Sequence, residues 1–216
     1  MKKVYLIMTL VCMMMASCGN DGDDGKIQGH EYVDLGLSVK WATCNVGADN
    51  PEDYGQYFAW GETSPKNEYT VDNYQHWNDA DGNGIWGYGE STINSDISGD
   101  AQYDAATTNW GGGWRMPTRE ECQELVDYCE WEWTQVNGIN GARVTGPNGS
   151  CIFLPAAGYR NGSSLGNVGY YGGFWSSTPR DTSAGAGAYF FDFGSGDESV
   201  GSGGRVNGFT VRPITE

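Results

Sequence analysis

The sequence feature that most restricts the fold is residues 118–130, which carry the one strong helix pattern of the chain. Thr118 stands at the N-cap position and Glu121 follows three residues later. This is the spacing of a capping box, in which each side chain hydrogen-bonds a backbone N–H near the other. Apolar residues then recur on one helix face, at Cys122, Leu125, Val126 and Cys129. One helix cannot bury that face alone, so we expect it to pack against sheets.

Short strand patterns surround this helix and are separated by long segments rich in glycine, which contributes 34 of the 216 residues. Strands are predicted in residues 30–48 (two strands around a turn), 56–60, 131–136, 142–145, 150–154, 173–178, 188–193 and 206–214. Loops are predicted in residues 63–109, 161–173, 180–187 and 194–204. The expected fold class is α+β, with small antiparallel sheets, one main helix at 118–130 and long Gly-rich loops.

The first residues have the features of an export signal. Lys2 and Lys3 precede an apolar run that ends at Ala16, and Ser17-Cys18 follows. This ending resembles a bacterial lipobox, so residues 1–17 are predicted to be a lipoprotein signal peptide and Cys18 the lipidated residue. An ordinary signal peptide with a chance cysteine is the alternative.

Residues 18–29 are predicted to be an acidic tether, and residues 30–216 a single domain. The tether resembles the surface-export signals of Bacteroidetes lipoproteins, although a plain solvated linker would have the same composition. We therefore expect an outer-membrane lipoprotein that faces the cell exterior. Removal of residues 1–17 leaves 10 basic and 28 acidic residues, a net charge of −18. Such a charge excludes nucleic acid as a partner.

Four cysteines remain after Cys18, and export makes disulfides possible. Cys122 and Cys129 lie about 10.5 Å apart along one helix face, which exceeds the reach of a disulfide. Each of them therefore pairs with Cys44 or Cys151, in either of two combinations, or all four remain as thiols.

Residues 79–90, DADGNGIWGYGE, match the twelve-residue calcium-loop pattern at every specified position. A bound Ca²⁺ would be coordinated by side-chain oxygens and one backbone carbonyl from Asp79, Asp81, Asn83, Ile85 and Glu90. No amphipathic helix pattern flanks the loop. A cluster of turn residues in an acidic protein is the alternative interpretation.

Several long motifs together resemble the Fibrobacter succinogenes major paralogous domain family, whose members are exported proteins and lipoproteins. These motifs are YVDLGLSVKWATCNVGA (32–48), GQYFAWGE (55–62), ISGDAQYDAATTNWGGGWRMPT (97–118), VTGPNGSCIFLPAAGYR (144–160), FWSST (174–178) and VRPI (211–214). The resemblance covers nearly all of residues 30–216. It implies a C-type-lectin-like fold similar to that of formylglycine-generating enzyme. Cys122 and Cys151 depart from the family pattern, which favours a Cys122–Cys151 disulfide together with Cys44–Cys129.

Catalysis is not expected, because His30 and His76 lie in no recognisable spacing of a nucleophile and a base. The activity of formylglycine-generating enzyme depends on C-terminal cysteines, and this chain has none after Cys151. Binding is predicted instead, through loops 161–173, 180–187 and 195–207, whose small polar residues and tyrosines suit a glycan or protein ligand. The candidate ligand-binding residues are Asn161, Asn167, Tyr170, Tyr171, Arg180, Asp181, Asp197, Arg205 and Asn207. Two alternatives remain: the loops are plain solvated turns, or the protein is a structural or assembly component of the cell surface with calcium used only for stability.

Overall fold

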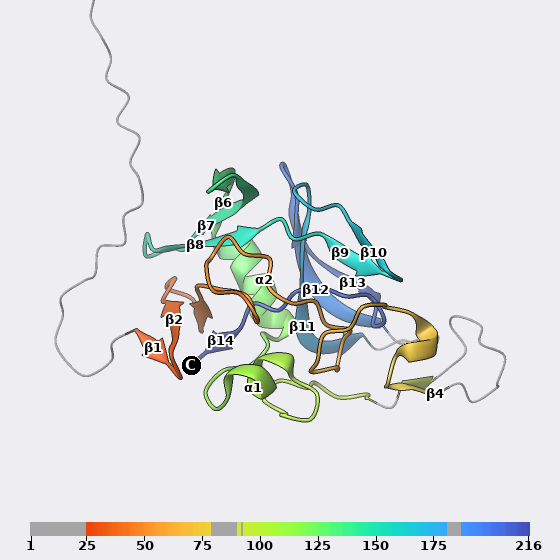
Figure 1. Ribbon diagram of the computed structural model, residues 1–216. Helices are drawn as coiled ribbons and strands as arrows, with labels where there is room; N and C mark the ends of the chain where they lie inside the picture. The colour runs from red at the N-terminus through yellow and green to blue at the C-terminus, as the bar shows by residue number, and fades with distance from the viewer. Residues whose placement is uncertain (1–24, 79–89, 92, 181–186) are drawn as a thin grey trace, which may run out of the picture.

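The computed structural model describes residues 25–78, 90–91, 93–180 and 187–216. Strands account for 39% of the chain and helices for 11%, which confirms the α+β class with small antiparallel sheets (Figure 1). One sheet joins the start of the described chain to its end, in the order β1 (Lys26–Ile27), β2 (His30–Val33), β3 (Lys40–Ala42) and β14 (Ile214–Thr215).

Two three-stranded sheets form the upper half of the molecule as drawn in Figure 1. The first has the order β6 (Glu130–Val136), β7 (Ile139–Thr145) and β8 (Cys151–Pro155), and the second β11 (Gly172–Arg180), β12 (Gly187–Phe193) and β13 (Glu198–Gly204). Two small hairpins pair β9 (Tyr159–Asn161) with β10 (Ser164–Gly166), and β4 (Trp77–Asn78) with β5 (Glu90–Ser91). One 3₁₀ turn spans Val71–Asn73.

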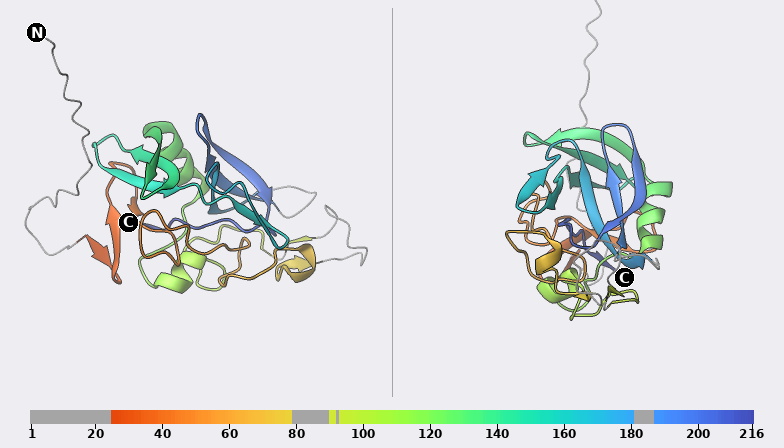
Figure 2. Two further views of the ribbon diagram at one scale, coloured as in Figure 1. Left: turned by 45° about the horizontal axis from the view of Figure 1, so that its top comes forward. Right: turned by 90° about the vertical axis from the view of Figure 1, so that its right-hand side faces the viewer.

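The predicted main helix is confirmed as α2 (Arg119–Tyr128). Its capping box has both expected bonds: Glu121 N–H donates to Thr118 Oγ1 at 3.3 Å, and Thr118 N–H donates to Glu121 Oε2 at 2.7 Å. Cys122 and Leu125 are fully buried in a core cluster that also contains Phe191 and Phe193. The apolar stripe of α2 therefore packs against the β11–β12–β13 sheet. The second view in Figure 2 shows the helix lying beside this sheet.

A second helix, α1 (Ala105–Trp110), lies in the segment predicted to be loop. It has six residues and no apolar period, so the hydrophobic pattern of the sequence could not reveal it. Asp104 determines its start, because the buried carboxylate accepts hydrogen bonds from Ala106 N–H at 2.8 Å and Thr107 N–H at 3.0 Å. Trp110 ends the helix within the core.

The prediction of a loop at 194–204 is wrong for residues 198–204, which form β13. This strand pairs in continuous register with β12, from Phe193 opposite Glu198 to Gly187 opposite Gly204. A side chain at Gly203 would meet the ring of Phe190, because a Cβ there would lie 3.0 Å from a ring carbon. Glycine in this strand thus makes room for the large residues of β12.

Other elements also differ from the sequence prediction, and the predicted loop 161–173 contains β10 (Ser164–Gly166) and the end of β9. Residues 57–60 are buried, and Gln56 N–H and Trp60 N–H donate to Val46 O at 2.9 Å and Arg205 O at 2.8 Å, but the segment forms an isolated bridge between Phe58 and Phe209 instead of a strand. The closing strand predicted at 206–214 is reduced to β14 and isolated bridges. The strand predicted at 142–145 begins earlier, at Ile139 of β7, and Asn137 and Gly138 form the β6–β7 turn with φ of +49° and +83°.

Cys44, Cys122, Cys129 and Cys151 form no disulfides with one another in the structure, so neither Cys44–Cys129 nor Cys122–Cys151 is present. The Cys44–Cys129 disulfide does not form because the two residues belong to different core clusters. Cys44 packs against the cluster around Trp110, whereas Cys129 packs against the cluster around Leu125. Cys122 is fully buried on the inner face of α2, and burial raises the pKa of its thiol well above the usual value. Of the three possibilities drawn from the sequence, two disulfide pairings and four thiols, the structure has the four thiols.

Arg115 joins the start of α2 to the chain end. Its guanidinium donates to both carboxylate oxygens of Glu121, at 2.9 and 2.6 Å, and to Glu216 Oε1 at 2.8 Å. Burial raises the pKa of Glu121, but the hydrogen bonds from Arg115 and Thr118 lower it by more, so its pKa lies below the usual value. Folding therefore favours the ionised Glu121 carboxylate.

Acid is expected to remove the contribution of Glu121 to stability. Because its pKa is lower in the folded than in the unfolded protein, this contribution is complete above the unfolded pKa of about 4.3 and is lost as the pH falls through the folded value. Glu121→Gln should destabilise the protein by about 1–3 kcal/mol at pH 7 and by less at pH 3. Urea unfolding at both pH values measures this difference. The exposed neighbour Glu120, changed to Gln, is the control; equal losses at both pH values would contradict the expectation.

Candidate functional site

A pocket of about 290 Å³ opens at the turn between β12 and β13; we call it the turn pocket. Its lining residues come from the segment before β11 and from the two strand ends: Tyr170, Tyr171, Asp192, Phe193, Gly194, Ser195, Asp197, Glu198 and Ser199. The hairpin that carries this turn projects at the top of Figure 1, on the opposite side from the C-terminus. Three of the predicted ligand-binding residues, Tyr170, Tyr171 and Asp197, are thus brought together.

A second pocket of about 140 Å³ adjoins the first, and we call it the tryptophan pocket. The two pockets share Gly194, Ser195, Asp197 and Glu198 as lining residues. The other wall is formed by Trp131 and Trp133 of β6 and Ala142 of β7. Both tryptophans lie in the strand predicted at 131–136, and neither is among the predicted site residues. Their alternation in EWEW was the available signal, because it puts both rings on one face of β6.

Tyr170 is displayed at the mouth of the turn pocket with 80% of its surface exposed. Asn167 positions it: this residue has a φ of +58°, and its carbonyl accepts hydrogen bonds from the backbone N–H groups of Tyr170 and Tyr171, both at 3.1 Å. Gly169 N–H donates to Ala156 O at 2.8 Å, which ties the loop to the sheet end. The exposed ring is therefore held by an ordered backbone.

Asp192 forms the polar wall of the turn pocket. Tyr171 Oη donates to its Oδ2 at 3.0 Å, and Ser199 Oγ donates to its Oδ1 at 2.6 Å. Burial, with the neighbouring carboxylate, raises the pKa of Tyr171, so this hydroxyl remains protonated and keeps donating. Asp192 and Ser199 were absent from the predicted site residues: Asp192 lies in the predicted strand 188–193, and the cross-strand register that sets Ser199 opposite it is not visible in the sequence.

The remaining predicted ligand residues lie elsewhere. Asn161 Nδ2 donates to Asn207 Oδ1 at 3.2 Å, beside the β9–β10 hairpin. Arg180, at the far end of β11, donates to Ser202 Oγ at 3.0 Å. Asp181 lies outside the described residues. The predicted ligand residues therefore do not form one site.

Arg205 was predicted to bind ligand, and the structure corrects this. The residue is 2% exposed, and its guanidinium donates to Gly187 O at 2.8 Å and to Ile93 O at 2.6 Å. The guanidinium carbon also lies 4.2 Å from the centre of the Trp60 ring. Arg205 thus joins the end of β13 to the interior, and its role is structural.

The predicted calcium loop lies almost entirely outside the described residues, which leave out 79–89 and therefore Asp79, Asp81, Asn83 and Ile85. Its flanks are described: β4 and β5 are antiparallel, with Asn78 opposite Glu90. Strands, and not helices, therefore bring the two ends of the loop together. Within the described part of the chain, no group of three or more His, Cys, Asp or Glu residues is arranged to hold a metal ion.

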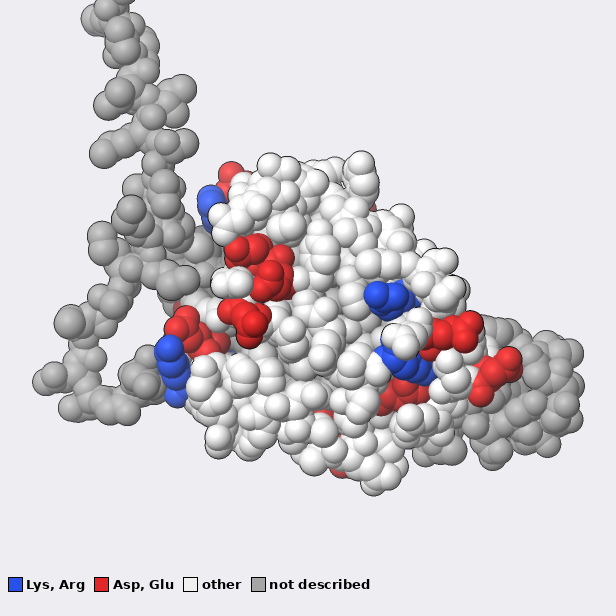
Figure 3. All heavy atoms as spheres, viewed as in Figure 1, with Lys and Arg blue, Asp and Glu red and all other residues white. Residues whose placement is uncertain are grey.

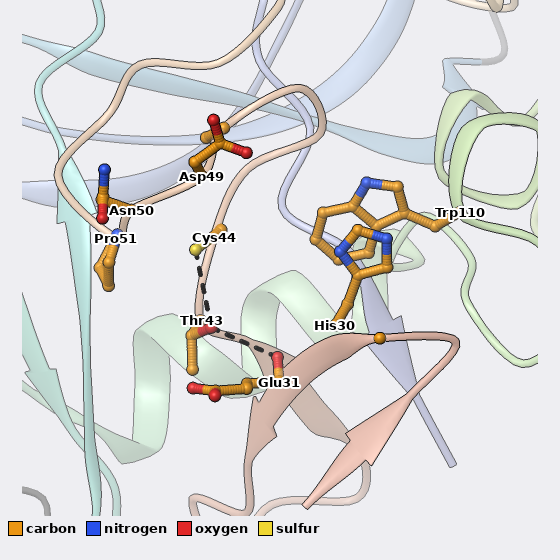
Figure 4. A pocket seen from close by; sticks show the side chains of 10 residues that line it. His30, Glu31, Thr43, Cys44, Asp49, Asn50, Pro51 and Trp110 are labelled. Atoms are coloured by element: carbon orange, nitrogen blue, oxygen red, sulfur yellow. Dashed lines mark hydrogen bonds between the residues drawn. The ribbon is translucent and has the colours of Figure 1, made fainter.

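A larger pocket, of about 410 Å³, lies between β2 and residues 43–51 (Figure 4). The His30 ring stacks on Trp110 at one side, with 3.7 Å between ring centres, and Asp49, Asn50 and Pro51 lie at the other. His30 thereby covers one face of the Trp110 ring. None of the predicted ligand-binding residues lines this pocket, so we take the turn and tryptophan pockets as the candidate site.

No protein-family model, curated protein or solved structure matches the chain. The resemblance described above therefore stays a prediction. In the described part of the protein, no helix is both long enough and apolar enough to cross a membrane. The acidic excess of the sequence is visible on the face drawn in Figure 3, where groups of Asp and Glu side chains stand among mainly uncharged residues.

Proposed function

We propose that the protein is a lipid-anchored binding module of the cell surface, and that the turn and tryptophan pockets hold a sugar unit of a glycan. The observation that carries the proposal is the exposed Tyr170 ring beside a pocket lined by carboxylates and serines. Aromatic rings pack against the C–H faces of a sugar, and carboxylates and hydroxyls accept hydrogen bonds from its hydroxyl groups. No catalytic step is part of the proposal.

A glycan fits the site better than a protein partner does. Specific protein interfaces bury about 800 Å² on each partner and are broad, whereas the turn pocket is small and concave. Its volume lies at the lower end of the range of about 300–1,000 Å³ that small-ligand sites occupy. A terminal sugar unit, with a second unit reaching the tryptophan pocket, matches this size.

The proposed surface location rests on the sequence, because Cys18 and residues 19–24 lie outside the described part of the chain. We propose that lipid on Cys18 holds the domain at the outer membrane, facing the exterior. We also propose a C-type-lectin-like arrangement of the domain. One main helix, small antiparallel sheets and the pairing of β3 with the last strand, β14, support that arrangement.

Tyr170→Ala is expected to weaken glycan binding about tenfold, the effect of losing a well-placed aromatic anchor. The full chain in detergent is applied to a glycan array, and affinities for the glycans that bind are then measured by calorimetry. Tyr128→Ala is the matched control, since Tyr128 is also exposed, at 68%, but lines neither pocket. Equal binding by wild type and Tyr170→Ala would contradict the site.

Removal of divalent cations with EDTA distinguishes the glycan-binding module from a structural component that uses calcium only for stability. Glycan binding that persists in EDTA supports a metal-independent site at the two pockets, and binding lost in EDTA makes the predicted calcium loop part of the function. The absence of binding to any glycan, with a lower melting temperature in EDTA, would favour the structural component with calcium used for stability.

A further inference from the structure

We infer that the sugar unit in the turn pocket carries a free, protonated amino group, and that the pocket rejects glycans with carboxylate or sulfate groups. This inference rests on the glycan-binding function proposed above and defines the class of glycan. It depends on the charges that line the two pockets, on the exposed aromatic ring and on the size of the site.

The charges that line the pockets have one sign. Asp192, Asp197 and Glu198 contribute three carboxylates, and the lining residues of both pockets include no Lys, Arg or His. The carboxylate of Asp192 accepts its hydrogen bonds from two neutral hydroxyls. Among the described residues, none of these three acids takes part in an ion pair. In the described part of the chain, therefore, no basic side chain of the pocket lining and no ion pair balances the negative charge of these three acids.

Asp197 and Glu198 lie where a ligand would meet them first. Both are exposed at the β12–β13 turn, and both line the turn pocket and the tryptophan pocket. An ammonium group in either pocket would have these two carboxylates nearby, whereas an anionic sugar would be repelled by them. The net charge of the whole chain, −16, acts in the same direction during the approach of a ligand.

The aromatic rings of the two pockets also favour an ammonium group. The face of a tyrosine or tryptophan ring attracts a cation, and the site offers the exposed ring of Tyr170 and the two partly buried rings of Trp131 and Trp133. A hexosamine combines an ammonium group with a face of C–H bonds and several hydroxyls. Each of these three features has a counterpart among the residues of the two pockets.

Two tetrasaccharides that differ only in acetylation test the inference directly: a β-1,4-linked glucosamine tetramer and its N-acetylated form. Their affinities for the full chain in detergent are measured at pH 6 in 50 mM and 500 mM NaCl. We expect the free amine to bind at least about threefold more tightly at low salt and this preference to shrink at high salt, as for exposed charge pairs. A galacturonic acid tetramer is expected not to bind.

The double variant Asp197→Asn/Glu198→Gln is expected to lose the preference for the amine, so that the two tetramers bind with similar affinities. Glu68→Gln/Glu120→Gln is the matched control, because it removes the same charge from exposed positions outside both pockets. Equal binding of the two tetramers, or binding of the galacturonate, would overturn the inference and leave glycan binding intact. No binding to any tetramer would overturn the inference, and no binding to any glycan on the array would overturn the function as well.

Discussion

Arg212→Ala is expected to lower the free energy of unfolding by about 3–5 kcal/mol, a large part of the stability of about 5–15 kcal/mol that a domain has. Arg212 is completely buried, and its guanidinium donates to Asn45 Oδ1 at 2.8 Å and to the carbonyls of Ala42 and Phe153, both at 3.0 Å. Burial lowers the pKa of Arg212 to about 10, which leaves it charged at neutral pH. The alanine variant would leave three buried acceptors without a donor and a cavity beside them.

Urea unfolding of the full chain measures the loss as a shift of the midpoint. Arg212→Lys should also be unstable, because an ammonium group cannot place three donors in the fork that the guanidinium provides. Arg143→Ala is the control: this arginine pairs with Glu132 at 2.9 Å on the surface, and its loss should cost at most about 1 kcal/mol. A loss of less than about 1 kcal/mol for Arg212→Ala would show that the interior adapts to its removal.

Asp104→Ala is expected to destabilise the protein by about 3–4 kcal/mol, because one buried carboxylate serves four backbone donors. Its Oδ1 accepts from Ala106 and Thr107 at the start of α1, and its Oδ2 accepts from Gly99 and Met116, both at 2.8 Å. The residue thereby joins the loop before α1 to the segment that leads to α2. Alanine would remove the helix cap and leave all four N–H groups without their acceptor.

Thr118→Ala is the matched control, since it removes an N-cap side chain that accepts one backbone hydrogen bond at the start of α2. A single lost cap costs about 1 kcal/mol. Urea unfolding of both variants should therefore differ by at least about 2 kcal/mol. Similar losses for Asp104→Ala and Thr118→Ala would mean that Asp104 acts only as a helix cap. Asp104→Asn tests the second oxygen, because its amide group would face the N–H groups of Gly99 and Met116.

The sequence predicted those elements whose cause is local. The helix α2 follows from Thr118 and Glu121, three residues apart, and from an apolar stripe within the same segment. The strand β13 has its cause elsewhere: glycines such as Gly203 form a strand there because β12 offers a pairing edge and the ring of Phe190 needs the space. Helix α1 likewise depends on one buried side chain, Asp104, and not on a period in the sequence.

The candidate site was predicted in part for the same reason. Tyr170, Tyr171 and Asp197 stood out because aromatic and acidic residues in Gly-rich loops are typical of binding surfaces. Trp131 and Trp133 could not be assigned to the site from the sequence, since about sixty residues separate them from the turn at 194–197 that completes the tryptophan pocket. Arg205 was assigned wrongly because its glycine-rich neighbours resemble an exposed loop, whereas its guanidinium fills the space above Trp60.

The sheet β1–β2–β3–β14 brings the first and last strands of the described domain to one side, away from the β12–β13 hairpin (Figure 1). For protein engineering, this means that both ends of the described domain lie on one side and the turn and tryptophan pockets on the other. A protein fused to either end of the domain would leave the two pockets accessible. A linker that joins these two ends would also allow new termini to be placed at the exposed turn of Asn137 and Gly138. The resulting circular permutant would retain every sheet.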